Sequence, residues 1–180
     1  MSNVTSTQPW ELRELNQSGI RRLKLVDARL ILALPTFGLV PKKDLEFFEF
    51  IFPSDLSCSA TVQRSERDTG SVFWNVSIGF TLPHMSDELV SWVDDNSDAL
   101  WIAITEDYNG FCRFFGGWQE GLRLSFQATT GSGPTAQNPM AFNLSAEQLI
   151  PYKSLPAYED KILFQNTAGF SYGFSLGFNS

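Results

Sequence analysis

The chain has 180 residues, of which 43% are hydrophobic and 18% are charged, and it carries a net charge of −7. This length fits a single domain with ample material for a core, and the composition argues against general disorder. The negative charge argues against nucleic-acid binding as a main function, because phosphate neutralisation supplies most of that affinity. We expect no signal peptide, and no apolar run approaches the roughly 20 residues of a membrane helix.

The first part of the chain combines a polar arm with two strand-like segments. Residues 1–19 are mostly polar and are predicted to form an N-terminal arm. Charged and apolar residues alternate over Arg22–Leu25 with the period of a half-buried strand. Leu45–Phe52 is apolar on nearly both faces, with Phe48 and Phe50 on one of them. Such a strand is either central in a sheet or lies at an interface.

The next part of the chain predicts a long β-hairpin. Ser57–Arg64 alternates between polar and apolar residues, and residues 65–70 (SERDTG) are typical of a turn. Val72–Leu82 follows as the longest regular strand of the sequence, and Pro83 ends it. Because the two alternating segments flank a short polar turn, we expect them to pair as one long hairpin.

A helix and a second hairpin come after this strand. Ser86 can cap a helix of about three turns, whose first turn carries two acidic residues as the helix dipole prefers. Residues 99–107 are predicted to form a strand, and residues 111–115 its return. Asn109 and Gly110 between them predict a type I′ turn, which needs positive φ at both central positions.

The last part of the chain contains two more strands and an aromatic tail. Leu122–Ala128 and Met140–Leu144 alternate as strands on either side of a Gly- and Thr-rich loop. Residues 153–180 form an irregular tail rich in Gly and Phe, which we expect to lie over its own domain or over a neighbour. The pattern predicts a mainly β protein: an antiparallel β-sandwich or half-barrel over residues 20–152, with one short flanking α-helix and a long hairpin.

The sequence offers little material for catalysis or metal binding. His84 stands alone, with no nucleophile or acid at a telling spacing, and a turn position explains it. Cys58 and Cys112 are isolated, and we expect two buried thiols in a protein made in a reducing cytoplasm. The acidic cluster of residues 94–98 lacks the Gly and the terminal Glu of a calcium loop. We therefore expect no enzymatic activity, no metal ion and no cofactor.

Three segments of the chain resemble tail-tube and neck proteins of tailed bacteriophages. They are Trp74–Pro83 (WNVSIGFTLP), residues 99–110, which end in EDYNG, and residues 114–145. The shared feature is the order of elements. A strand ends in an Asx-Gly turn, the next strand ends in an aromatic residue and Gly, a third strand leads into a Thr-Gly loop, and a short aromatic strand follows. The chain departs from this pattern at Phe115, where the pattern has Leu, and in its aromatic tail.

The resemblance implies a non-enzymatic virion protein that is assembled in the host cytoplasm. Its copies would pair edge to edge into a ring of the tail tube, neck or tail-completion region, with neighbouring ring proteins as partners, DNA as non-specific passing cargo, and no membrane. The predicted hairpin favours the same interpretation, because open strand edges are a liability for a monomer. The candidate inter-subunit residues lie at the hairpin end, in the aromatic strand and in the tail: Arg64, Glu66, Arg67, Asp68, Phe48, Phe50, Phe164, Phe170 and Phe174.

Two alternatives remain open at the level of sequence. The first is a carbohydrate- or protein-binding β-sandwich module, in which Trp101, Tyr108 and Trp118 would be the stacking residues. The second is an enzyme of unfamiliar type, which the lone His84 disfavours because a nucleophilic triad would have to centre on it. The three functions therefore require different surfaces: a ring requires contact surfaces between copies, a binding module requires exposed stacking residues, and an enzyme requires a catalytic site.

Overall fold

The computed structural model describes residues 18–33, 40–41, 47–53, 56–83, 86–117, 120–129, 139–156 and 158. These residues form a mainly β fold with one α-helix, which confirms the predicted fold class. In chain order the elements are β1 (Ile20–Asp27), the 3-10 helix η1 (Ala28–Leu30), β2 (Ile31–Ala33), β3 (Val40–Pro41), β4 (Phe47–Ile51), β5 (Cys58–Glu66), β6 (Val72–Leu82), α1 (Asp87–Asp95), β7 (Leu100–Asp107), β8 (Cys112–Phe115), β9 (Leu122–Ala128), β10 (Met140–Gln148) and β11 (Lys153–Leu155).

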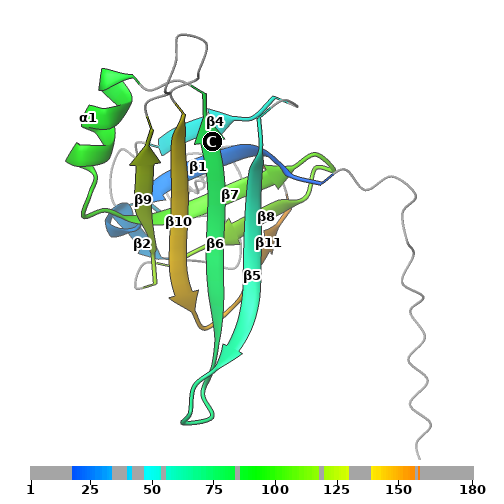
Figure 1. The fold of residues 1–180 in the computed structure, drawn as a ribbon. Coiled ribbons are helices and arrows are strands. Elements are labelled where there is room, and N and C mark those ends of the chain that lie inside the picture. Colours follow the sequence, from blue (N-terminus) through cyan, green and yellow to red (C-terminus); the bar gives the residue numbers. More distant parts are fainter. Residues whose placement is uncertain are drawn as a thin grey trace, which may run out of the picture.

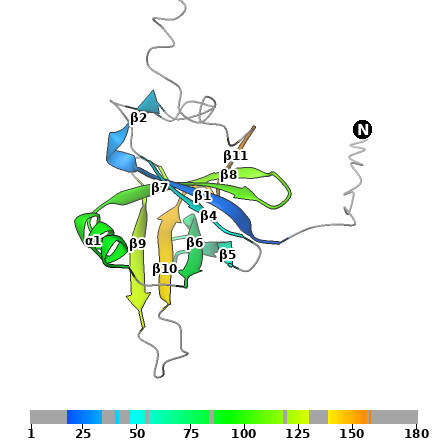
Figure 2. The same ribbon diagram turned by 90° about the horizontal axis from the view of Figure 1, so that it is seen from above.

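The strands form two layers that diverge from β7. One edge of β7 pairs with β1, and the other edge pairs with β9 at its start and with β8 farther along. β9 leaves β7 after Leu122 and Arg123 and continues beside β10, so the sheet folds over at this junction. We name the layer of β4, β1, β7, β8 and β11 the β7 layer, and the layer of β9, β10, β6 and β5 the hairpin layer. The layers face each other with their strands crossing steeply, as in an orthogonal sandwich (Figures 1 and 2).

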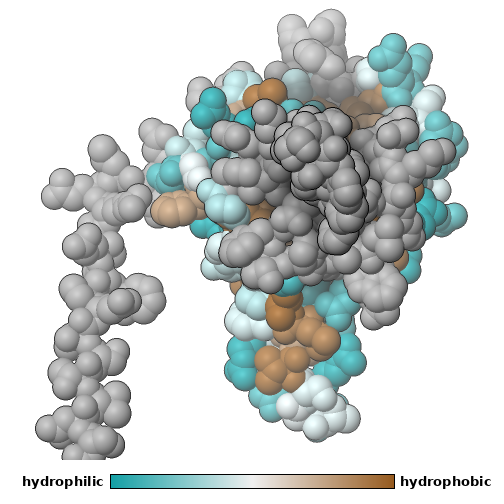
Figure 3. All heavy atoms as spheres, turned by 180° about the vertical axis from the view of Figure 1, so that it is seen from behind, coloured by the Kyte–Doolittle hydropathy of each residue, from teal (hydrophilic) through white to brown (hydrophobic). Residues whose placement is uncertain are grey.

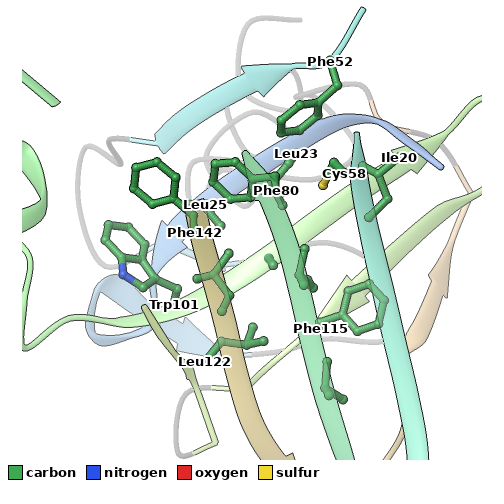
Figure 4. Packing of buried hydrophobic residues seen from close by; sticks show 14 of the residues in the cluster. Ile20, Leu23, Leu25, Phe52, Cys58, Phe80, Trp101, Phe115, Leu122 and Phe142 are labelled. Atoms are coloured by element: carbon green, nitrogen blue, oxygen red, sulfur yellow. The ribbon is translucent and has the colours of Figure 1, made fainter. Parts of the chain in front are cut away.

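The main core fills the space between the two layers. Leu23 and Leu25 of β1, Phe80 of β6 and Trp101 of β7 converge there from opposite sides (Figure 4). The alternation predicted for β6 produces its inner face, since Ile78 and Phe80 are buried and the residues beside them are less so. Burying each large apolar side chain contributes about 1.5–3 kcal/mol, which is the main force that holds the layers together.

The aromatic strand β4 contributes to this core. The ring of Phe48 lies edge-on to Trp92 at 4.9 Å between centroids, and the ring of Phe50 lies 5.1 Å from that of Phe80. Among the described residues β4 pairs only with β1, so it is an edge strand and not a central one. The two rings therefore pack partly against the chain's own core, and a contact of their remaining exposed surface with a second copy stays a prediction. Ile51, on the reverse face, is 63% exposed.

The outer face of the β7 layer carries a second, smaller core. Val26, Ile102 and Phe114 are buried there together with Tyr158. β11 pairs with β8 beside this core, so the domain continues past residue 152, where the sequence analysis placed the start of a tail. The physical reason is that β7 is apolar on both faces, and each face needs a cover.

The helix α1 forms where its capping signal predicts it. The hydroxyl oxygen of Ser86 accepts a hydrogen bond from the backbone N–H of Leu89 at 3.2 Å. Asp87 and Glu88 occupy the first turn, where the helix dipole favours negative charge. Val93 is buried against the main core, and the helix lies beside β9 at the edge of the hairpin layer (Figure 1).

The two tight hairpins share one turn geometry, and it differs from the predicted type I′ turn. Gly110 has φ +80° and donates its N–H to the carbonyl oxygen of Asp107 at 3.0 Å, while no described non-Gly residue has positive φ. Gly70 has the same φ, and its N–H donates to the carbonyl of Arg67 at 2.8 Å. A turn followed by a left-handed Gly is the second common hairpin closure. The carboxylate of Asp107 favours it by accepting from the N–H groups of Asn109 and Phe111, each at 2.9 Å.

Candidate assembly surface

The end of the β5–β6 hairpin extends past the rest of the molecule, beyond the point where β10 stops pairing with β6 at Trp74 (Figure 1). All nine residues of β5 pair with β6 in continuous register, from Cys58 opposite Phe80 to Glu66 opposite Val72. The main core reaches only part of this length, because Val76 is buried whereas Trp74 is half-buried and Val72 is 37% exposed. The projecting end is therefore held mainly by its own ladder of hydrogen bonds.

The four candidate residues at the hairpin end are all exposed. Arg64, Glu66, Arg67 and Asp68 lie on the last part of β5 and in the turn that follows. The guanidinium of Arg67 donates to the Oε2 of Glu147 on β10 at 2.6 Å, with both side chains more than half exposed. An ion pair of this kind contributes little to stability. These charges are consequently available to a partner without loss of the fold.

The outer edge of β5 has no strand partner among the residues that the structure describes. In the described part of the chain β5 pairs with β6 on one side and ends the strand order of its layer on the other. Over Ser59–Gln63 this edge contains no charged residue and no Pro, and its pairing with β6 has no bulge. Natural proteins protect long edge strands with those devices. A regular and uncharged edge is instead suited to accept another strand.

An open groove lies between β5 and the inner face of the β7 layer. It has a cavity volume of about 310 Å³ and is lined by residues from both layers: Ile20, Ala60, Val62, Thr105, Arg113, Phe115 and Tyr152. The floor is mostly apolar, and Arg113 gives it one fixed cation, because its guanidinium donates to the Oδ2 of Asp107 at 2.9 Å. The groove leaves the two layers open on this side, as in a half-barrel.

Apolar side chains continue from the groove onto the projecting hairpin. By alternation, Val72 and Trp74 lie on the same face of β6 as the buried Val76. Leu149 and Ile150, which follow β10, are 73% and 44% exposed. Seen from behind, hydrophobic residues gather over the lower part of the hairpin, on the side turned toward the β7 layer (Figure 3). An exposed apolar cluster next to an open strand edge is typical of a protein-interaction surface.

The groove itself was not predicted from the sequence. Ala60 and Val62 appeared there only as inward residues of a strand, and Tyr152 stood at the boundary of a supposed tail. The apolar run Leu149-Ile150-Pro151-Tyr152 was the available signal, because exposed turns are seldom this apolar. The groove forms where β5 and the β7 layer are no longer packed against each other. These strands are far apart in the sequence, so no local pattern predicts where their packing ends.

Of the residues expected to stack on a sugar, the two that the structure describes, Trp101 and Tyr108, do not form a surface platform. Trp101 is 1% exposed and lies inside the main core, which rules out its proposed role in a surface site. Tyr108 is half-buried, and its hydroxyl donates to the carbonyl oxygen of Phe52 at 2.8 Å. Trp118 lies outside the described residues, as do His84 and the tail candidates Phe164, Phe170 and Phe174.

Several described titratable groups have structural roles. Arg22 donates to the Oε1 of Glu49 at 2.7 Å and lies 3.6 Å from a carboxylate oxygen of Glu106, so it forms an ion pair with each acid. Cys58 and Cys112 are buried free thiols, and burial raises the pKa of Cys58 to about 12. A thiol with this pKa remains protonated and is a poor nucleophile at neutral pH.

Neither a metal site, nor a membrane-spanning helix, nor a similar known protein indicates a function for the described part of the chain. Within the described ranges no group of three His, Cys, Asp or Glu side chains could hold a metal ion. In the same part of the chain no helix has the length and apolar character needed to cross a membrane. No protein-family model, curated protein or solved structure matches this chain significantly. A function is therefore inferred from the chain's own surface.

Proposed function

We propose that this chain is a non-enzymatic structural protein of a tailed-bacteriophage virion. In this proposal its copies form a ring in the tail tube, neck or tail-completion region, and the ring lines or connects the DNA channel. The observation that carries the proposal is the outer edge of β5, which over Ser59–Gln63 is uncharged and, among the described residues, unpaired, next to the projecting end of the hairpin. The resemblance of residues 74–83, 99–110 and 114–145 to tail-tube and neck proteins supplies the class of particle.

The physics of strand edges supports a ring. An edge strand as long as β5 presents a row of backbone N–H and C=O groups that a second chain can pair with. In a closed ring each copy covers its neighbour's edge through a heterologous contact, so no edge remains free. The exposed charges of Arg64, Glu66, Arg67 and Asp68 would then set the register between neighbours, because buried mismatches of charge are costly.

The overall charge supports a role next to DNA without binding to it. The net charge of −7 makes non-specific adhesion of DNA unfavourable, because the phosphate backbone is repelled. A channel wall needs that property, since DNA has to pass through without sticking. The partners in this proposal are copies of the same chain, adjacent ring proteins and DNA as passing cargo.

Shortening the hairpin tests the proposal. Arg64 and Trp74 lie opposite each other, so Ser65–Phe73 can be replaced by Asn-Gly, which closes a two-residue turn. We expect the wild type to form rings or polymers in size-exclusion chromatography with light scattering and in negative-stain images. The shortened chain should remain folded, because the segment removed contains no core residue. It should be monomeric, because the deletion removes Glu66, Arg67 and Asp68, which would set the register between neighbours. Its melting temperature should fall by about 2–4 °C, which corresponds to about 1 kcal/mol.

The controls separate assembly from folding. Arg67→Ala removes the exposed ion pair with Glu147 and the contact of the guanidinium with the Phe73 ring, and it should leave the melting temperature nearly unchanged, which distinguishes loss of these contacts from loss of the hairpin. A wild-type chain that stays monomeric at high concentration would contradict the ring. Genes for portal, capsid or tail proteins next to this gene would support the particle class, and a neighbourhood without them would count against it.

A further inference from the structure

The sequence after the described domain contains a segment with the pattern of a half-buried strand. Over residues 169–178 (GFSYGFSLGF) every second position is large and apolar, and the positions between them are Gly or Ser. The apolar positions are Phe170, Tyr172, Phe174, Leu176 and Phe178. A period of two places all five side chains on one face of an extended chain. The segment carries no charge, so its chemistry matches the uncharged edge Ser59–Gln63.

The groove offers what such a strand needs. A chain added beside β5 would pair its backbone with the free edge and point alternate side chains into the groove between the layers. The groove wall contains Val62 and the rings of Phe115 and Tyr152, and the Arg113 guanidinium lies 5.8 Å from the Tyr152 ring. Aromatic side chains gain from such a setting through buried area and from contact with a cation. The Gly and Ser positions would face outward, where little room is required.

We infer that residues 169–178 of a neighbouring copy bind as an added strand along the free edge of β5, with their aromatic face in the groove. This inference rests on the proposed ring and identifies the contact that would link one copy to the next. Tyr158, the last described residue, is buried on the outer face of the β7 layer, whereas the groove opens on the inner face. The ten residues between Tyr158 and Gly169 span at most roughly 33–36 Å when extended, which is enough to reach an adjacent molecule in a ring.

Two lysine substitutions on one strand test the groove. Ala60 lines the groove and is exposed, so Ala60→Lys places a charge in the path of the aromatic side chains while the domain can still fold. Thr61→Lys adds the same charge to the opposite, exposed face of β5 and serves as the matched control. We expect Ala60→Lys to raise the concentration at half-assembly at least about tenfold, a change equivalent to about 1.4 kcal/mol. Thr61→Lys should assemble like the wild type.

A pair of variants in the tail tests the donor segment in the full-length chain. Phe170→Ser combined with Phe174→Ser removes two aromatic side chains of the alternating face, and we expect the same loss of assembly as for Ala60→Lys. Ser171→Ala combined with Ser175→Ala changes the other face and should assemble normally. If both pairs assemble like the wild type, the inference is wrong and the ring must be held by other contacts.

Cross-linking shows which copy supplies the strand. Gln63→Cys is introduced in one preparation and Ser171→Cys in another, and the two are mixed under mild oxidation. A disulfide between the two chains is the expected result, and the buried Cys58 and Cys112 should not take part. A cross-link that forms only when both cysteines are in one chain would overturn the inference, while rings could still exist. A wild type that neither assembles nor cross-links between chains would contradict both the inference and the proposed ring.

Discussion

The junction of the two layers depends on Gly121, and its replacement by Ala provides a sharp test of the fold. Gly121 immediately precedes β9, at the point where β9 lies against the start of β7. A Cβ atom there would lie 2.6 Å from the Cβ of Leu100, 3.1 Å from its carbonyl carbon and 3.2 Å from the N of Trp101. None of these atoms can move away by rotating a side chain, so one of the two strands must shift.

The expected loss follows from two opposing effects. Forcing a methyl group into a packed site costs about 1–3 kcal/mol. Replacing Gly by Ala reduces the entropy of the unfolded chain, which returns about 0.4–1 kcal/mol. At the centre of these ranges the free energy of unfolding of Gly121→Ala should fall by about 1.3 kcal/mol, or the melting temperature by about 3–5 °C. Gly79→Ala is the matched control, because a Cβ there meets only the carbonyl oxygen of Phe142 at 3.9 Å. It should be neutral or slightly stabilising.

Urea unfolding followed by tryptophan fluorescence measures both variants, since the core contains the fully buried Trp101. All proteins are compared at one concentration, because assembly would add to the apparent stability. If Gly121→Ala unfolds at the same urea concentration as Gly79→Ala, then β9 is not held against β7. The two-layer arrangement that forms the groove would lose its basis in that case.

Two further predictions concern single buried groups. Asp107→Ala should lower the free energy of unfolding by about 2–4 kcal/mol, because the carboxylate accepts from the N–H groups of Asn109 and Phe111 and from Arg113. Asp107→Asn keeps an acceptor for the turn and should cost about half as much. Equal losses for the two variants in urea unfolding would assign the whole effect to the contact with Arg113. The raised pKa of Cys58 implies that folding keeps this thiol protonated, so its contribution to stability is present below pH 9.0 and is lost as pH rises toward about 12. The difference in free energy of unfolding between the wild type and Cys58→Ala should then shrink by at most about 1.4 kcal/mol per pH unit above pH 9.0. A difference that does not change with pH would refute the raised pKa of Cys58.

Local patterns in the sequence predicted most of the secondary structure. The alternation of residues 57–64 and 72–82 corresponds to β5 and β6, and the capping signal at Ser86 corresponds to the start of α1. These features depend on the period of the chain and on hydrogen bonds between near neighbours, so they are visible in one sequence. The hairpin at Asn109-Gly110 was also predicted, but its turn type was not, because the carboxylate of Asp107 decides it.

The candidate site was predicted only in part. The charged residues at the hairpin end, Arg64 to Asp68, lie where the turn signal put them and are exposed. Phe48 and Phe50 were assigned to an interface because an apolar strand can face either a core or a neighbour. In the structure the Phe48 ring packs against Trp92 and the Phe50 ring against Phe80, which are far away in the sequence, and the predicted contact with a second copy stays a prediction.

The sequence by itself determined which segments become strands, where the long hairpin turns and that one helix follows it, because each depends on residues close together in the chain. Only the tertiary structure decided that the sheet divides at β7, that β4 faces the chain's own core, and that β5 is left with an open edge above a groove. These three features depend on which strands far apart in the sequence pair or pack together, and on the length over which they do so. A strand's own pattern states which face is apolar, but the rest of the fold determines what covers that face.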